Sequence, residues 1–329
     1  MHMRPRFLLL FLLGWACRFL TAGPGPLRTV ADIPLPGASS RFDYACLDPG
    51  AHRLYLNHMG AGDVVVFDTA NRKVIRVLKG FPRCTGILVV PSRHELYVSA
   101  PGEGAVAVLD TTTLKEIARI KVGEFPDGIA FDPDDQRVFV SDESGCQVAV
   151  IDAQTHRLLS RIPMGGEVGN TQYDPSSRRI YSNVQTLNQL VAMDPRTLKV
   201  VDRIPLPGAE GNHGLLIDAE HHLAFAACEG NAVLLVVDLK TRKVTASFPV
   251  GRGPDVLAFD PGSGRLVVAS ESGPAAIFQE AGGTLRREGN QDVGRNAHVV
   301  AIDPVTHLLY FPLMRLGLRP GLRIMAPGN

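Results

Sequence analysis

The sequence predicts an all-β fold, a seven-bladed β-propeller whose blades are four-stranded antiparallel sheets. Three observations predict it. Short Val-rich runs, 33 Gly and 24 Pro indicate many short strands joined by tight turns. An apolar run ends at a turn seven times, at intervals of 42–44 residues, and four strand patterns fit within each interval, as is typical of a propeller blade. The residues that end these runs are Asp48, Val90, Asp132, Asp174, Asp218, Asp260 and Asp303.

The third unit shows how one blade is assigned. Gly128–Asp132, Arg137–Ser141 and Gln147–Ile151 are predicted to be its strands a, b and c, and Lys115–Lys121 shows the outer strand d of the preceding unit. An aspartate opens the turn from c to d in five units, where its carboxylate can accept hydrogen bonds from backbone amides. These carboxylates, and those that end the strands a, are predicted to be structural. The five are Asp68, Asp110, Asp152, Asp194 and Asp238.

The seventh unit has no strand d of its own. Its strand c is expected at Leu322–Ala326, close to the end of the sequence. The segment Val30–Ala38 precedes the first strand a, and its "IPLPGA" repeats the sequence of Ile204–Ala209, which ends a strand d. We therefore expect the N-terminal strand to join the last blade and close the ring, which removes an exposed sheet edge. The sixth unit, "AIFQEAGGTLRREG", lacks the usual turn and is expected to be the most irregular blade.

Residues 1–22 are predicted to be a secretory signal peptide, and residues 23–329 a single propeller domain. Two arginines precede the apolar run Phe7–Ala16, and small residues follow it. Because Arg18 interrupts the run, it is too short to span a membrane comfortably, and no transmembrane segment is expected in the mature chain. The expected location is periplasmic or extracellular. A lipid-anchored form is less favoured, since Gly14 stands three residues before Cys17 where a lipoprotein has a branched apolar residue.

Charge and cysteine content exclude several classes of function. Residues 1–22 hold three of the 34 basic residues and none of the 33 acidic ones, so 31 basic residues face 33 acidic ones in the rest of the chain. This balance gives no electrostatic reason to expect nucleic acid or an anionic membrane as a partner. The sequence has no CxxC pair, which argues against a thioredoxin-type redox site, and free thiols are expected. We expect a monomer.

The repeat motif resembles a known family. "LYLNH", "LYVSA", "VFVSD" and "IYSNV", each followed by a run such as "VVVFDT" or "VAVLDT", resemble the YVTN-type β-propeller repeat. The stretches "SRFDYACLDP" and "RNAHVVAIDPVTHLLYFP" resemble the exported YncE-like members. The resemblance covers the predicted mature chain. It implies a seven-bladed propeller exported to the periplasm or cell surface, and it does not imply a particular chemistry.

The candidate site lies where the strands a begin. These positions, five residues before the end of each strand a, face the upper mouth of the central channel, where the d–a and b–c loops meet. In the fourth blade this position is Gly169, and the next residue, Asn170, stands in for it. The predicted ligand-binding residues are Asp43, Thr85, Asp127, Asn170, His213, Asp255 and His298.

Three interpretations of this ring remain open. Imidazole and carboxylate groups converging on one point suit a divalent metal such as Zn, Mn or Fe, with His213, Asp255 and His298 as ligands. The same groups suit a polar ligand without a metal. They are also compatible with a purely structural role in the loops, because no metal-binding spacing motif such as HExxH is present. No cofactor is implied with certainty.

Two functions of different class follow. The first is an exported scaffold that binds a partner protein or a small polar ligand at the upper mouth and catalyses no reaction. The alternative is a metal-assisted hydrolase or lactonase that uses Asp43 together with His213, Asp255 and His298. Four other histidines lie four residues after the strand-a ends, and we predict that they are turn residues at the opposite end of the ring. They are His52, His94, His222 and His307.

Overall fold

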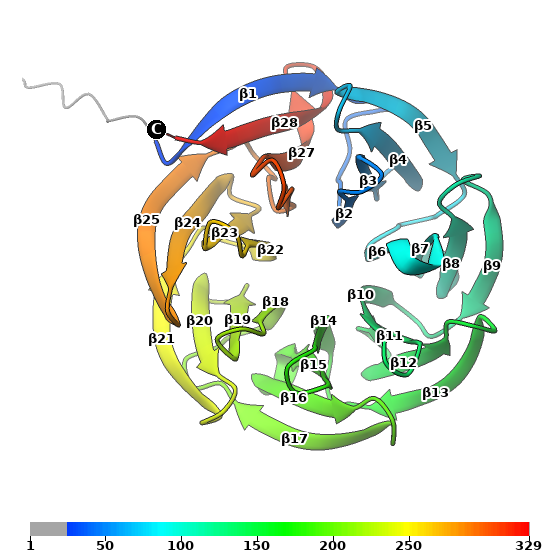
Figure 1. Cartoon of the computed structure of the whole chain (residues 1–329), viewed down its shortest axis with the longest axis vertical. Coiled ribbons are helices and arrows are strands. Elements are labelled where there is room, and N and C mark those ends of the chain that lie inside the picture. Colours follow the sequence, from blue (N-terminus) through cyan, green and yellow to red (C-terminus); the bar gives the residue numbers. More distant parts are fainter. Residues whose placement is uncertain (1–24, 329) are drawn as a thin grey trace, which may run out of the picture.

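The computed structural model describes residues 25–328 and has the predicted architecture. Seven sheets of four antiparallel strands stand around a central axis (Figure 1). Each of the first six blades is a meander in which the chain runs from the axis outward. The predicted signal peptide, residues 1–22, lies outside the described residues. No helix within the described residues has the length and apolar character needed to span a bilayer.

The strands follow the 42-residue period of the sequence, so each repeat unit forms one blade. Blades 1 to 3 are β2 (Ala45–Asp48), β3 (Arg53–His58), β4 (Asp63–Asp68), β5 (Lys73–Lys79); β6 (Ile87–Val90), β7 (Glu95–Ala100), β8 (Ala105–Asp110), β9 (Glu116–Lys121); and β10 (Pro126–Asp132), β11 (Arg137–Asp142), β12 (Gln147–Asp152), β13 (Arg157–Pro163). Blades 4 and 5 are β14 (Val168–Asp174), β15 (Arg179–Val184), β16 (Gln189–Asp194), β17 (Lys199–Pro205); and β18 (Asn212–Asp218), β19 (Leu223–Cys228), β20 (Val233–Asp238), β21 (Lys243–Pro249).

The last two blades complete the ring. They are β22 (Pro254–Asp260), β23 (Arg265–Ser270), β24 (Pro274–Ala281), β25 (Thr284–Asp292); and β26 (Ala301–Ile302), β27 (Leu309–Leu316), β28 (Arg319–Pro327), β1 (Leu27–Pro34). Three single-turn 3-10 helices lie in loops: η1 (Pro91–Arg93), η2 (Pro101–Glu103) and η3 (Gln185–Leu187).

The core lies between neighbouring blades. Strands b and c are covered on both faces by adjacent sheets, so they are apolar on both faces, and every residue of β7 and of β19 is buried. One such core joins Tyr97 and Val106 of blade 2 to Val138 of blade 3. The outer strands alternate between covered and exposed residues, as β17 does, because they have solvent on one side.

Polar residues near the ends of strands b link one blade to the next. The Asn57 side chain donates to the Gly86 carbonyl of blade 2 at 3.1 Å, and the Ser99 hydroxyl donates to the Asp127 carbonyl of blade 3 at 2.7 Å. The Asn183 amide donates to the Gly214 carbonyl of blade 5 at 2.9 Å. The polar residue that ends "LYLN" or "LYVS", Asn57 or Ser99, therefore fixes the position of the next blade's inner strand.

The predicted structural aspartates are confirmed. At the ends of strands a, Asp132 Oδ1 accepts from the Asp134 amide at 2.9 Å. In the c–d turns, Asp152 Oδ1 accepts from the amides of Gln154 and Thr155 at 2.9 and 2.8 Å. Each carboxylate satisfies turn amides that would otherwise lack a partner within the protein.

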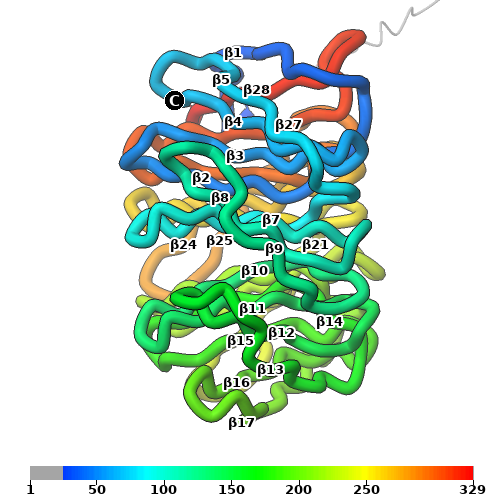
Figure 2. The backbone as a smooth tube through the Cα atoms, turned by 90° about the vertical axis from the view of Figure 1, so that its right-hand side faces the viewer, coloured from blue at the N-terminus to red at the C-terminus, as the bar shows by residue number. Residues whose placement is uncertain are grey.

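The N-terminal strand closes the ring as predicted, although it lies at Leu27–Pro34 and begins earlier than the Val30–Ala38 segment suggested. β1 pairs antiparallel with β28, from Leu27 opposite Pro327 to Pro34 opposite Gly321. β1 (blue) lies beside β28 (red) both down the axis and from the side (Figures 1 and 2). A bidentate ion pair adds to this contact, since the Arg323 guanidinium donates to Asp32 at 2.7 and 2.9 Å.

The expectation that blade six is the most irregular is wrong. Its β24 and β25 are eight and nine residues long and pair from Pro274 opposite Asp292 to Ala281 opposite Thr284, with one bulge at Glu288. Gly282 and Gly283 close this hairpin with φ of 59° and 82°, and Glu280 Oε1 accepts the Gly283 amide at 2.6 Å in place of the usual aspartate. Blade seven is the irregular one, because its inner strand β26 has only two residues.

Four exposed apolar residues on the outer strands have a common cause. In blade 1, Val66 pairs with Arg76 and Phe67 with Val74, so Ile75 between them is a β-bulge residue without a partner. The same shift recurs in the outer hairpins of the next three blades. The bulge residues are Ile75, Ile117, Leu159 and Val201, with exposed fractions of 39–49%.

The closing strand is expected to stabilise the whole ring. In a variant of the mature protein that begins at Leu35, β28 becomes an open sheet edge. We expect a melting midpoint lower by roughly 10 °C, since each kcal/mol shifts a domain of this size by about 2–4 °C. We also expect self-association, measured by light scattering. A synthetic peptide of residues 25–36 should restore the midpoint, and an unchanged midpoint without the peptide would contradict this role for β1.

Candidate functional site

The seven predicted site residues lie together at the upper mouth of the channel. They stand at or just before the beginnings of the inner strands, and all are less than a tenth exposed. His213 is the most exposed of them at 9%, and His298 is exposed by 1%. The set is Asp43, Thr85, Asp127, Asn170, His213, Asp255 and His298.

At Gly86 and Gly214 the inner strands of neighbouring blades approach so closely that no side chain fits between them. A Cβ atom on Gly86 would lie 1.8 Å from the Asp127 carbonyl oxygen, and one on Gly214 would lie 2.0 Å from that of Asp255. The residue after the site position therefore has to be small in these blades. This approach brings the site side chains of neighbouring blades into one cluster.

Tyr44 is the one large side chain at that following position, and it closes the channel. The other blades have Gly86, Gly128, Asn170, Gly214, Val256 and Val299 there. The Tyr44 hydroxyl donates to Asn170 Oδ1 and lies 3.3 Å from Asp127 Oδ2 and 3.2 Å from His213 Nε2. Burial raises the pKa of this phenol well above its usual value, and the nearby carboxylates of Asp127, Asp255 and Asp43 add to the effect. The sequence analysis missed Tyr44, although its size against the other six residues is a visible signal.

His213 carries a positive charge in this cluster. The Gln185 amide nitrogen donates to Glu143 at 2.8 Å, so the Gln185 oxygen faces His213 Nδ1 at 3.2 Å and accepts its proton. Nε2 lies 3.5 Å from Asp127 and 3.7 Å from Asp255. Burial by itself would lower the pKa of His213, but these two carboxylates outweigh it and raise the pKa to about 9.

Three buried carboxyl groups face one another around the axis. Burial raises the pKa of Asp43 well above its usual range, and the charges of Asp255 and Asp127 raise it further. Burial also raises the pKa of Asp127, and that of Asp255 to about 7, while His213 opposes both shifts. Like charges at this depth are costly, so the site favours any positive group placed between them.

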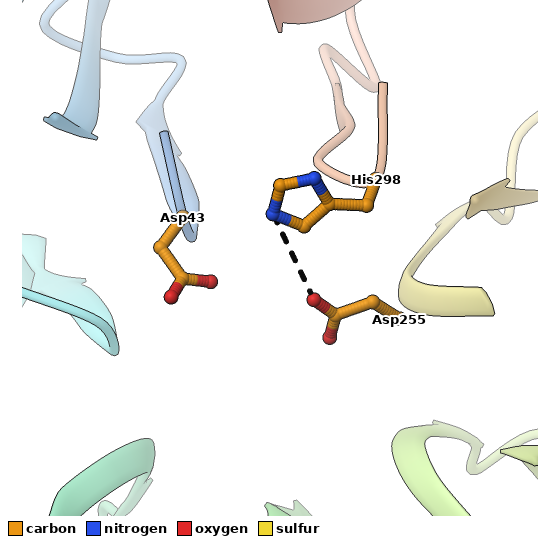
Figure 3. Close-up of side chains that lie close together, drawn as sticks. All are labelled: Asp43, Asp255 and His298. Carbon is orange, nitrogen blue, oxygen red and sulfur yellow. Dashed lines mark ion pairs between the residues drawn. The ribbon is translucent and has the colours of Figure 1, made fainter. Parts of the chain in front are cut away.

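His298 stands on the other side of Asp255 and is neutral. Its Nδ1 lies 3.1 Å from the Asn296 carbonyl oxygen, and because a carbonyl only accepts, Nδ1 carries the proton. Its Nε2 lies 3.9 Å from Asp255 Oδ2 and has no hydrogen-bond partner (Figure 3). Burial lowers the pKa of His298 to about 4, and the positive charge of Arg41 contributes.

The predicted metal ligands are divided between two groups that share Asp255. In the first, ligand atoms of Asp43, Asp255 and His298 lie within 4.8 Å of one another (Figure 3). In the second group, ligand atoms of His213, Glu229 and Asp255 lie within the same distance of one another. The two predicted histidines therefore face opposite oxygens of one carboxylate.

Arg41 is a second site residue that the sequence analysis missed. It comes from the loop that leads into blade 1, outside the repeat positions. Its Nη2 lies 3.7 Å from Asp255 Oδ2, and its Nη1 makes an ion pair with Glu271 at the rim. The side chain is 37% exposed, so it partly balances the buried carboxylates while remaining in contact with solvent.

A cavity of about 220 Å³ opens above Tyr44, and its lining is acidic. A second cavity of about 380 Å³ lies on the other side of Tyr44, bordered mainly by apolar inner-strand residues such as Ile87, Leu257 and Val300. Tyr44 borders both cavities, the acidic upper chamber and a lower chamber of mixed polarity. The upper chamber is lined by the carboxylates of Asp43, Asp127, Asp255, Glu143 and Glu229, by Arg41, Thr85 and His213, and by Tyr44, Phe125 and Met59.

The four histidines that were predicted to be turn residues take no part in this cluster. All of them have a left-handed backbone, with φ between 52° and 58°, in the turns at the lower end. That conformation identifies them as turn residues, as predicted. They are His52, His94, His222 and His307.

Comparison with known proteins supports the fold. No protein-family model matches the sequence, and no curated protein does. A solved chain described as Kuenenia stuttgartiensis hydrazine synthase is similar with a TM-score of 0.74 and 17% identity, over 91% of this chain and 99% of that one. A chain from a mitotic checkpoint complex has a TM-score of 0.78 and 10% identity, over 99% of this chain and 100% of that one. At such identities the likeness shows a seven-bladed propeller fold and nothing finer.

The charge of His213 is testable by titration. Because its folded pKa of about 9 lies above the ordinary 6.5, its contribution to stability is fully present below pH 6.5 and is lost as the pH rises through 9. This contribution amounts to at most about 3 kcal/mol. We expect its imidazole NMR signals to titrate near pH 9, and at lower pH in the Asp127→Asn variant. A His213 midpoint near or below 6.5 would contradict this assignment.

Proposed function

We propose that this protein is an exported β-propeller that binds a small, positively charged polar ligand at its upper mouth. The observation that carries the proposal is the charge of the upper chamber. Five carboxylates line it, and the positive groups that line it are Arg41 and His213. A concave, partly dry site concentrates such an electrostatic field, so it favours a cation over a neutral or anionic molecule.

The shape of the chamber supports a small ligand rather than a protein surface. Asp43, Asp127 and Asp255 are almost fully buried in a cavity of about 220 Å³, whereas Glu229 is exposed at its border. The side chains of Tyr44, Phe125 and Met59 contribute apolar contact area to its lining. The rest of the lining is polar and mostly charged, so the chamber suits a small polar molecule with some apolar surface. Insertion of a lysine or arginine from a partner protein uses the same chemistry and is the competing outcome.

Ligand binding can be tested with three molecules of similar length and different charge. We expect isothermal titration calorimetry to show binding of putrescine, but not of butanediol or succinate. Glu229→Gln should weaken binding about fivefold, because one carboxylate near 4 Å from a cation in water-like surroundings contributes about 1 kcal/mol. The matched control is Glu220→Gln, an exposed glutamate of the same blade in a lower turn. Preferential binding of succinate, or an equal effect of both variants, would refute the proposal.

Export is proposed from the N-terminal sequence and from the YncE-like resemblance of the repeats. Arg4 and Arg6 followed by the apolar run Phe7–Ala16 are typical of a secretory leader. We expect mass spectrometry of the protein from an exporting host to find cleavage near residue 22. Replacing Leu9 and Leu12 by arginine should retain the full-length form inside the cell. Recovery of uncleaved wild-type protein in the cytosol would count against export.

The metal-assisted hydrolase stays a prediction of the sequence. The same purified protein can be assayed against simple lactones and esters with and without added metal. Turnover that disappears in His298→Gln would favour the hydrolase over a binding protein.

A further inference from the structure

The buried group Asp43–Asp255–His298 contains polar atoms that nothing in the protein satisfies. His298 Nε2 is fully shielded and has no hydrogen-bond partner, and its residue is only 1% exposed. Asp255 Oδ1 also lacks a hydrogen-bond partner, but it lies on the side of His213, 3.7 Å from its Nε2. An unsatisfied buried polar atom costs about 1–3 kcal/mol. Other polar groups of the same mouth, such as the Tyr44 hydroxyl and His213 Nδ1, do have partners. The unsatisfied His298 Nε2 therefore indicates something that the protein chain itself does not supply.

The tautomer of His298 shows what kind of group is missing. Because Nδ1 donates to the Asn296 carbonyl, the neutral ring presents the lone pair of Nε2 to the site. That lone pair faces Asp255 Oδ2 at 3.9 Å, and Asp43 lies opposite (Figure 3). Electron pairs from three ligands pointing at one position repel one another. A positively charged acceptor of electron pairs at that position turns the repulsion into attraction.

We propose that Asp43, Asp255 and His298 bind a first-row divalent cation of the Zn²⁺ class. One imidazole with two carboxylates suits such an ion better than Ca²⁺ or Mg²⁺, which prefer oxygen ligands alone. Ligand atoms bound to zinc at ~2.0–2.1 Å stand about 3.3 Å apart in a tetrahedron. The three donors, within 4.8 Å of one another, reach that spacing through small side-chain rotations.

The surroundings of the triad fit this assignment. A histidine that binds a metal almost always donates its other nitrogen to a carbonyl or carboxylate, as His298 does to Asn296. Three protein ligands leave a fourth position open, and two of the three, Asp43 and Asp255, also line the upper chamber. His213 serves as a charged partner of Asp127 and Asp255 and is not a ligand, so Asp43 replaces it in the predicted set.

A second cluster is the natural competitor for added metal. Asp218, His221 and Glu280 also lie within 4.8 Å of one another, at the lower end of the ring. There, however, His221 Nδ1 already contacts Asp218 Oδ2 at 2.8 Å, and Glu280 Oε1 accepts the Gly283 amide. Its atoms are satisfied by the protein, so it lacks the observation that singles out the upper triad.

The inference goes beyond the proposed function, because it concerns one ion rather than the organic ligand, and each can fail alone. Mature protein is dialysed against a chelator and titrated with Zn²⁺ by calorimetry, and with Co²⁺ by visible absorption. We expect one equivalent of tight Zn²⁺ binding and the absorption bands of tetrahedral Co²⁺. His298→Gln and Asp43→Asn should each weaken binding by more than the ~10–100-fold typical of outer partners. His221→Gln, and His94→Asn in an exposed turn, are the matched controls and should bind as wild type does.

Three outcomes would overturn the proposal. The first is the absence of stoichiometric uptake by the wild-type protein, which would mean that a buried water satisfies His298. The second is loss of uptake in His221→Gln but not in His298→Gln. The third is tight binding that both Asp43→Asn and His298→Gln retain. If one upper-site variant does not fold, as judged by its melting curve, paramagnetic shifts of the His298 ring in Co²⁺-loaded wild type decide the question. The putrescine titration is run on the metal-free protein, so its result is separate.

Discussion

The close approach of seven inner strands to one axis determines most of what this structure does. Where a Cβ atom on Gly86 or Gly214 would fall within 2.0 Å of the next blade's backbone, only glycine is tolerated. The residue just before each such position cannot turn away from its neighbours, and its side chain points into the mouth. Polar residues at these positions therefore meet whether or not they have a function. The fold supplies proximity, and the choice of side chains supplies the chemistry.

The buried carboxylates at the mouth lower the stability of the folded protein. Asp43, Asp127 and Asp255 are buried within one small volume, and within that cluster only His213 and Arg41 oppose their charge. Apolar residues of similar size at these positions would cost less, as replacements of buried ion pairs in other proteins show. This electrostatic cost is the physical basis of the proposal that a positively charged group binds at the mouth.

The repeat in the sequence was enough to predict the blade number, the closing strand and the seven site positions, since these depend only on the period. Three features escaped it. Tyr44 and Arg41 lie outside the repeat position that was compared between blades, and their contacts reach across the ring. The two sides of Asp255, with His213 on one and His298 on the other, depend on side-chain rotamers and not on spacing. The prediction for blade six was wrong because its c–d turn uses other residues. There Gly282 and Gly283 form the turn, and Glu280 accepts the turn amide that an aspartate accepts in other blades.

Ring closure by β1 has a consequence for the order of events during biosynthesis. The strand that completes the last blade is the first to be made, and its partner β28 lies almost 300 residues later. At ~5–20 residues per second the 329-residue chain takes roughly 15–60 s to synthesise, and β1 waits for nearly all of that time without its partner. The first six blades form from contacts that are local in sequence, whereas the seventh pays the full entropy of joining the two ends. The segment Leu27–Pro34 therefore has no sheet partner until the last blade has been made.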